Sequence, residues 1–422
     1  MTDEQNPRHY LVPRLRFPEF LDAGEWEKKM LGEIADSITE RAADRKLTLF
    51  SITSGIGLVS QIDKFGKEIA GKQYKNYYVI KNGDFAYNKS ATKEYPEGFI
   101  AMYSGADDGA VPNSVFTCFR VRNECANPKY LNYLFAKNLH GKWLKKVISV
   151  GARAHGSLNV DDKDLFSIPL PFPGKLSFIP EQQKIAECLS TLDELITAHS
   201  RKLAALKKYK QGLLQQLFPR PGETVPRLRF PEFEGAGEWE EVLMSQVCDF
   251  QSGFPFPSSG FNDERIGIRL ARNRDLKFDD SVVFFSLEYS LEFLINDGDL
   301  LVGMDGEFIP IVWSKGKALL NQRVGRIHSK SAHKRFLLYA LARVLSKIEE
   351  ETGRTTVVHL SATTFLQSTA LFPSIPEQQK IAECLSSIDE LITAQAQEIE
   401  ALKAHKQGLL QQLFPVAATA QA

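Results

Sequence analysis

A 41-residue segment that occurs twice limits how this chain can fold. Ile179–Pro219 and Ile375–Pro415 are identical at 31 aligned positions, and a repeat of this kind marks a duplicated structural unit. Each copy begins with Ile-Pro-Glu and ends with Leu-Phe-Pro. Proline suits the first turn of a helix, whereas a proline further along cannot continue it. Both copies are therefore predicted to be long helices.

Apolar residues recur in each copy at spacings of three and four, which is typical of a coiled-coil seam. The first copy carries a net charge of +2 and the second −3. Opposite charges beside a seam favour pairing of the two helices with each other, intramolecular and antiparallel, over packing of each on its own domain. The predicted spacer and subunit-interface residues are Ile185, Leu189, Leu192, Leu195, Ile196, Ile381, Leu385, Ile388, Leu391 and Ile392.

Four leucines lie beside this seam, namely Leu195, Leu214, Leu391 and Leu410. Their position on an outer face suits two kinds of contact, either with a partner subunit or with the adjacent domain. The sequence leaves both alternatives open.

A second repeat precedes each half of the chain. Val12–Glu27 and Val225–Glu240 both begin Val-Pro-Arg-Leu-Arg-Phe-Pro-Glu-Phe, and each is expected to be an extended segment that packs through its tryptophan. The chain is thus two concatenated units, each with a leader, a variable domain and a long helix. The predicted boundaries are a first variable domain at 1–178, a helix at 179–219, a second variable domain at 220–374, a helix at 375–415 and a disordered tail at 416–422.

The variable domains contain many short apolar runs separated by Gly, Pro and Asp turns, and each has a helical stretch near its end. The predicted fold class is α+β. Two mixed α/β domains are joined by two long helices that form an antiparallel coiled coil with pseudo-twofold symmetry.

Composition restricts the functional class. The net charge is zero, so DNA binding would need a local basic patch. The first variable domain has a net charge of +4 and the second −3, which gives the second domain weaker electrostatic support. Apolar runs are too short for a membrane span, and the N-terminal residues lack the apolar stretch of a signal peptide. The five cysteines show no Cys-x-x-Cys spacing, which predicts a reducing cytoplasm and no metal site.

Catalytic motifs are missing from the sequence. It contains no phosphate-binding loop and no His-Glu-x-x-His motif. Asn127-Pro128 is followed by Lys129 rather than by a second proline, so it is not the Asn-Pro-Pro-aromatic motif of an amino-methyltransferase. We therefore expect no catalytic residues, although scattered carboxylates leave a nuclease cluster open.

Polar loops of the variable domains are the better functional candidates. They mix amide, hydroxyl and cationic donors, the groups that contact phosphates and base edges. For any single residue, the alternative is an ordinary solvated side chain. The residues predicted to bind DNA are Asn88, Lys89, Ser90, Lys93, Arg153, His155, Ser157, Arg272, Asn273, Arg274, Asn321, Gln322, Arg323, Arg354 and Thr355.

The order of these parts resembles the specificity subunit of type I restriction-modification enzymes. The resemblance is carried by the repeated Ile-Pro-Glu-Gln-Gln-Lys-Ile-Ala-Glu-Cys-Leu-Ser at 179–190 and 375–386, and by the long helices that follow. Leu320–Val324 in the second variable domain is also similar to the target-recognition domains of this family. The resemblance covers about Val12 to Pro415.

The resemblance implies a function in DNA addressing. Each variable domain would be a target-recognition domain that reads one half of a bipartite, asymmetric site in double-stranded DNA, and the helices would set the gap. Two modification (methyltransferase) subunits and the restriction (translocase/nuclease) subunits would be partners. S-adenosylmethionine, ATP and Mg²⁺ would be held by those partners and no cofactor by this chain.

Two other classes remain as alternatives. One is a coiled-coil scaffold that binds proteins through its variable domains, which predicts no sequence-dependent DNA binding. The other is a self-contained nuclease or methyltransferase, which predicts activity from the purified chain alone.

Overall fold

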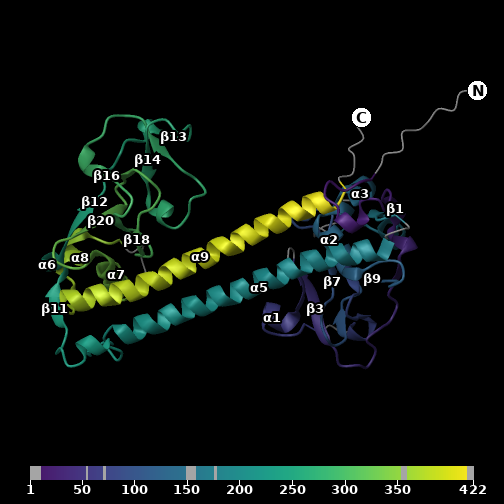
Figure 1. Ribbon diagram of the computed structural model, residues 1–422, viewed down its shortest axis with the longest axis horizontal. Helices are drawn as coiled ribbons and strands as arrows, with labels where there is room; N and C mark the ends of the chain where they lie inside the picture. The colour runs from purple at the N-terminus through teal and green to yellow at the C-terminus, as the bar shows by residue number, and fades with distance from the viewer. Residues whose placement is uncertain are drawn as a thin grey trace, which may run out of the picture. The chain divides into compact units, whose positions relative to one another are not determined.

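The computed structural model describes residues 11–53, 56–69, 73–148, 158–174, 178–352 and 359–415. The chain divides into two compact units (Figure 1). Unit 1 consists of Met1–Ser200 and Gln397–Ala422, and unit 2 consists of Arg201–Ala396. Two long helices, α5 (Phe178–Leu217) and α9 (Ile375–Leu413), each contribute one part to either unit.

Unit 1 contains two four-stranded sheets and a two-stranded ribbon. The first sheet has the order β2 (Ala35–Ser37), β9 (Phe116–Val121), β6 (Phe85–Asn88), β7 (Phe99–Met102). The second sheet has the order β4 (Gly57–Ser60), β3 (Thr48–Thr53), β8 (Gly109–Val111), β5 (Tyr78–Ile80). The ribbon pairs β1 (Glu27–Met30) with β10 (Pro169–Phe172). The short helices are α1 (Gln61–Phe65), α2 (Pro128–Ala136), α3 (Leu139–Val147) and α4 (Asp162–Phe166).

Unit 2 has the same plan. Its four-stranded sheet has the order β12 (Cys248–Ser252), β20 (Val324–Ser329), β17 (Leu300–Gly303), β18 (Pro310–Val312). Its five-stranded sheet has the order β13 (Phe261–Asn262), β15 (Phe284–Phe285), β14 (Ile268–Ala271), β19 (Ala318–Leu320), β16 (Leu294–Ile295). The ribbon pairs β11 (Glu240–Leu243) with β21 (Thr369–Phe372). The helices are α6 (Met244–Val247), α7 (Lys334–Thr352) and α8 (Ala362–Gln367).

The strand orders of the two units correspond, except that β13 is an additional strand in the second sheet of unit 2. In the first sheet of each unit, β2, β9, β6 and β7 take the places of β12, β20, β17 and β18. In the second sheet, β3 pairs with β8 in parallel, as β14 does with β19. A duplicated fold therefore lies beneath variable sequences that show little similarity to each other.

The long helices pair in antiparallel fashion within each unit. In unit 1, Ile185 and Leu189 near the start of α5 share a core with Leu410 and Leu413 at the end of α9. In unit 2, the start of α9 shares a core with the end of α5, including Leu217. The predicted fold class is thus confirmed: mixed helix and strand domains with two long helices packed together. The helices also pack on the domains. Pairing of the helices with each other and packing of each helix on a domain, which the sequence analysis treated as alternatives, therefore occur together.

The predicted spacer residues fall into three groups by burial. Ile185, Leu189, Ile381, Leu385 and Ile388 are buried, and Leu192, Ile196 and Ile392 are half-buried. Leu195 and Leu391 are exposed, at 41% and 56%. Leu410 is buried in the core of unit 1, and Leu214 packs against the core of unit 2. The leucines beside the seam therefore divide into a pair that contacts the adjacent domain and a pair that faces outward.

The repeated leader is fastened to the repeated helix start. In unit 1, the Arg16 guanidinium donates two hydrogen bonds to the Glu181 carboxylate, at 2.8 and 2.7 Å, and Trp26 Nε1 donates to the same carboxylate. In unit 2, Arg229 contacts Glu377 with the same geometry, and this carboxylate raises the pKa of Arg229. These contacts explain why both leaders contain this arginine and why both repeated helices begin with this glutamate.

The buried ion pair of unit 2 provides a stability test. Glu377 is almost fully buried, so Glu377→Ala leaves Arg229 beside it without a counter-charge. We expect unfolding free energy to fall by about 3 kcal/mol. The matched control is Glu232→Ala, which removes the partner of the half-exposed Lys380 and should cost less than about 1 kcal/mol. Urea denaturation measures both; equal midpoints for the two variants would contradict this assignment.

Candidate nucleic-acid interface

In unit 1, the predicted segment Asn88–Lys93 begins at a junction with Val115 and Leu158. Lys89 follows β6, and its backbone N–H donates to the Val115 carbonyl at 3.0 Å, just before β9. The Lys89 carbonyl accepts from Leu158 N–H at 2.7 Å. The predicted segment Asn88–Lys93 therefore begins next to Leu158, which directly follows the predicted Arg153–Ser157 in the sequence. Arg153, His155 and Ser157 themselves lie outside the described residues.

The remaining predicted residues of unit 1 take different roles in this loop. The Asn88 Oδ1 atom accepts from the Ser90 backbone N–H at 3.0 Å, so this amide shapes the turn. Lys89 and Ser90 are half-buried, whereas Lys93 is exposed. At the far end of the loop, Gly98 has a φ of +87°, and a Cβ there would lie 2.5 Å from the Asn88 carbonyl oxygen. Only glycine fits this close return of the chain.

Unit 2 repeats the junction with other side chains. Met304 follows β17, and its N–H donates to the Arg323 carbonyl at 3.0 Å, while its carbonyl accepts from Leu360 N–H at 2.8 Å. Met304 thus stands where unit 1 has Lys89, and Arg323 stands where it has Val115. The predicted Arg354 and Thr355 lie outside the described residues.

A polar cluster surrounds Asp305, the residue after Met304. His359 Nδ1 lies 2.8 Å from Asp305 Oδ1, and the Arg323 guanidinium lies 3.3 Å from the same oxygen. Asn273 Nδ2 donates to the Asp305 carbonyl at 2.9 Å. Arg323 is 54% exposed. Its guanidinium is therefore held by Asp305 and still accessible to solvent. Two predicted segments, 272–274 and 321–323, therefore meet at one place.

Asp305 and His359 were not among the predicted residues. His359 lies four residues after the predicted Thr355 in the sequence, so the prediction indicated its neighbourhood but not the residue itself. Asp305 follows Met304 within the β17–β18 connection, and nothing in its local sequence distinguishes it from other surface aspartates.

Two further predicted arginines, Arg272 and Arg274, also have carboxylate partners within unit 2. Arg272 makes a two-pronged contact with Asp275, at 2.8 and 2.9 Å, and this hydrogen bonding raises the pKa of Arg272. Asp275 is buried, so the pair holds the short 3-10 helix Asn273–Leu276 in place. Arg274 is exposed and lies 2.8 Å from Asp280. Arg272 therefore has a structural role here, whereas Arg274 shares its exposed surface with a carboxylate.

The turn at Asn321–Arg323 is held mainly by its backbone. Gln322 N–H donates to the Phe254 carbonyl at 3.0 Å, and Phe254 N–H donates to Leu320. A Cβ at Gly253 would lie 2.1 Å from the Asn321 carbonyl oxygen, which explains the glycine. Because the backbone fixes this turn, the exposed Gln322 side chain is not needed to hold it, and the exposed Arg323 side chain contacts Asp305 instead.

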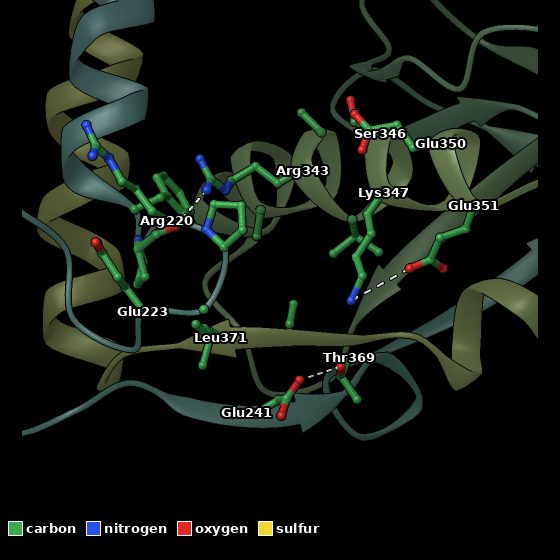
Figure 2. A pocket seen from close by; sticks show the side chains of 18 residues that line it. Arg220, Glu223, Glu241, Arg343, Ser346, Lys347, Glu350, Glu351, Thr369 and Leu371 are labelled. Atoms are coloured by element: carbon green, nitrogen blue, oxygen red, sulfur yellow. Dashed lines mark hydrogen bonds and ion pairs between the residues drawn. The ribbon is translucent and has the colours of Figure 1, made fainter.

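Unit 2 also contains a cleft away from the Asp305 cluster, and its lining carries many charged side chains. About 740 Å³ in volume, it is lined by the segment Phe218–Glu223, by α7 and by the β11–β21 ribbon (Figure 2). Arg343 donates to the Pro219 carbonyl at 2.7 Å, and burial lowers the pKa of Arg343. Figure 2 shows carboxylates on several sides, namely Glu223, Glu241, Glu350 and Glu351. Three cations, Arg220, Arg343 and Lys347, line the same cleft, so its charge is mixed and it has no basic surface of the kind that favours a polyanion.

Comparison with known proteins places the chain in a family. A family model described as the type I restriction modification DNA specificity domain matches residues 23–208 and again residues 236–404. These matches cover most of the chain, which therefore belongs to the type I restriction-modification DNA specificity family. Specificity subunits of this family are in general not catalytic.

Two curated relatives illustrate the similarity. The chain is 36% identical over 152 residues to the EcoBI specificity subunit of Escherichia coli, which covers 36% of this chain and 32% of that subunit. It is 28% identical over 347 residues to the MjaVIII specificity subunit of Methanocaldococcus jannaschii, covering 75% and 77%. The first match thus spans only about a third of its relative.

Solved structures support the fold. The S subunit of the type I restriction-modification system from M. genitalium matches with a TM-score of 0.61 and 14% identity, covering 96% of this chain and 100% of that one. A chain from a structure of a type I R-M system matches with a TM-score of 0.52 and 21% identity, covering 92% and 97%. Within the described part of the chain, no helix is both long enough and apolar enough to span a membrane.

A pair of arginine variants separates structural from exposed cations in unit 2. Arg272→Ala leaves the buried Asp275 without its ionic partner, so unfolding free energy should fall by about 2 to 3 kcal/mol. Arg323→Ala removes an exposed side chain and should change it by about 0.5 kcal/mol or less, while weakening DNA binding by the assembled complex and reducing its salt dependence. Urea denaturation and DNA titrations at several salt concentrations measure both; unchanged DNA binding by Arg323→Ala would contradict its predicted contact.

Proposed function

We propose that this chain is the DNA-recognition subunit of a type I restriction-modification complex. Each unit reads one half of a bipartite site, and the paired helices set the gap between the halves. The observation that carries this proposal is the duplicated junction, at Lys89 in unit 1 and at Met304 in unit 2, where the same backbone geometry presents different loops.

Differences at equivalent positions support an asymmetric site. Lys89 corresponds to Met304 and Val115 to Arg323, so the two junctions offer different donors. Phosphate contacts supply affinity and register, whereas groove contacts supply sequence discrimination. Two copies of one fold with unlike loops should therefore select two unlike half-sites.

In this proposal the chain recognises the DNA sequence, and its partner subunits carry out the catalytic reactions. We infer two modification subunits that hold S-adenosylmethionine and methylate adenine, together with restriction subunits that use ATP and Mg²⁺ to translocate and cut DNA. No cofactor is assigned to this chain. The protein-binding scaffold is less favoured, because membership in a DNA-specificity family does not lead to it.

A surface duplicated on both helices suggests where modification subunits dock. Several residues near the start of α5 are exposed and recur unchanged on α9, among them Gln183, Glu187, Glu194, Leu195 and Ala198, with counterparts Gln379, Glu383, Glu390, Leu391 and Ala394. Six successive positions, 199–204, then differ between the copies. Exposed side chains are under little packing constraint, so their identity in both copies is explained by a common partner that binds twice.

The proposed function is tested by mapping adenine methylation. The chain is co-expressed with modification subunits, and methylated adenines are located by sequencing. We expect one gapped, asymmetric two-part motif, with adenine methylation in each part. Methylation of a continuous motif, or none that depends on this chain, would refute the proposal.

The docking surface predicts the effect of truncating its apolar residues. The double variant Leu195→Ala and Leu391→Ala should weaken assembly with modification subunits by at least about tenfold, with little change in melting temperature because both side chains are exposed. The control is Leu287→Ala, an exposed leucine of unit 2 outside this surface. Analytical ultracentrifugation measures assembly. Normal assembly together with a lowered melting temperature would count against docking here.

A further inference from the structure

Unit 1 contains a polar contact in which three elements meet. Tyr133 on α2 donates from its hydroxyl to Asp193 Oδ2 on α5, at 2.8 Å. Lys406 on α9 donates to the other oxygen of Asp193, at 2.5 Å, and its Nζ lies 5.2 Å from the Tyr133 ring centroid. We call these three residues the joint of unit 1, because they connect the recognition domain to both helices.

Unit 2 contains the same joint with the helices exchanged. Tyr339 on α7 donates to Asp389 Oδ2 on α9, at 2.7 Å, and Lys210 on α5 donates to Asp389 Oδ1, at 2.5 Å. Lys210 Nζ again lies 5.2 Å from the tyrosine ring centroid. The lysines interrupt the apolar seam at matching places in the sequence, and the joints explain both interruptions.

The hydrogen bonds of the joints require a defined orientation of the domain relative to the helices. Burial, followed by the hydrogen bond to the aspartate, raises the pKa of both Tyr133 and Tyr339 well above the usual range. The raised pKa favours the neutral form of each tyrosine, which donates the hydrogen bond to the aspartate. Each aspartate uses one oxygen for the domain and the other for the second helix. Rotation of the domain would break the tyrosine contact on a carboxylate that also binds lysine, and hydrogen bonds to charged groups are the stronger kind.

The apolar contacts between domain and helix do not impose the same restriction, and the other directional contacts, to Glu181 and Gln182, lie at the start of α5. Ile185, Leu189 and Leu410 contribute apolar area, and apolar burial is non-directional. A cleft of about 610 Å³ opens at this edge of unit 1, and Tyr133, Asp193 and Lys406 form part of its wall. Where the cleft interrupts the packing, the joint connects the domain to the helices.

We propose that the two joints fix the rotation of each recognition domain about the helix pair and thereby define the accepted gap between half-sites. This inference rests on the proposed function. A gap changed by one base pair displaces a half-site by about 3.4 Å and turns it by about 35° around the DNA axis. A domain attached by apolar contacts and by the polar contacts at the start of α5 alone can follow that turn at lower cost than a domain that the joint also holds further along the helix. The joint residues are therefore positioning residues for the spacing.

The experiment uses the assembled modification complex with Tyr133→Phe, Tyr339→Phe and both together. Its substrates are three DNA duplexes with the mapped gap, a gap shorter by one base pair and a gap longer by one base pair. We expect the ratio of off-gap to on-gap methylation to rise by about tenfold in the variants, the effect of one hydrogen bond to a charged group. The matched control is Tyr209→Phe, an exposed tyrosine of α5, which should keep the wild-type ratio.

A second substitution removes the same bond from the other side. Asp193→Asn keeps the shape of the side chain but weakens both the tyrosine and the lysine contact, and it should raise the ratio in the same direction. If the variants lose stability or on-gap rate while the ratio stays at the wild-type value, the joints are only structural and the inference is overturned. If the wild-type complex has no gap requirement, the proposed function fails, and that result is visible before any variant is measured.

Discussion

Each recognition domain depends on a helix end supplied from a distant part of the sequence. Phe414, directly after α9, is fully buried in unit 1 and packs 5.4 Å from the ring of Tyr130. Phe218, directly after α5, does the same in unit 2 by stacking on Phe336 at 5.3 Å. Because these rings complete the two cores, neither domain can bury its apolar surface until both helices are in place. The antiparallel pairing of the helices follows from this requirement.

The duplicated sequence is the set of residues that meets this requirement. Glu181 binds the leader arginine, and Gln182 accepts from the Asn127 N–H at the start of α2. Glu377 and Gln378 make the equivalent contacts in unit 2, where His333 N–H is the donor. The ion pairs between the helices use lysines and aspartates that both copies share. These ion pairs between the helices therefore do not depend on the difference in net charge between the two copies.

The helices were predictable because their signal is local and periodic, and the repeat doubled it. The leader was less predictable: its tryptophan packs as expected, but Arg16 finds its partner 165 residues away in Glu181. The cluster of Asp305, Arg323 and His359 was hard to predict for the same reason, because its members are distant in the sequence. Its members are separated in sequence and meet only because β17 and β20 are neighbours in one sheet. Composition can indicate polar loops, but sheet topology decides which of them come together.

The junctions show how a fixed framework can carry loops of unrelated sequence. At Lys89 and at Met304, the hydrogen bonds that position the chain run between backbone atoms only. Any residue other than proline supplies the same N–H and carbonyl, so a lysine can replace a methionine there without loss of these bonds. The same holds for Val115 and Arg323, whose carbonyls accept the junction bonds. The junction bonds thus place no requirement on the side chains at these positions, whereas the leaders and helix starts make their contacts through side chains that both copies share.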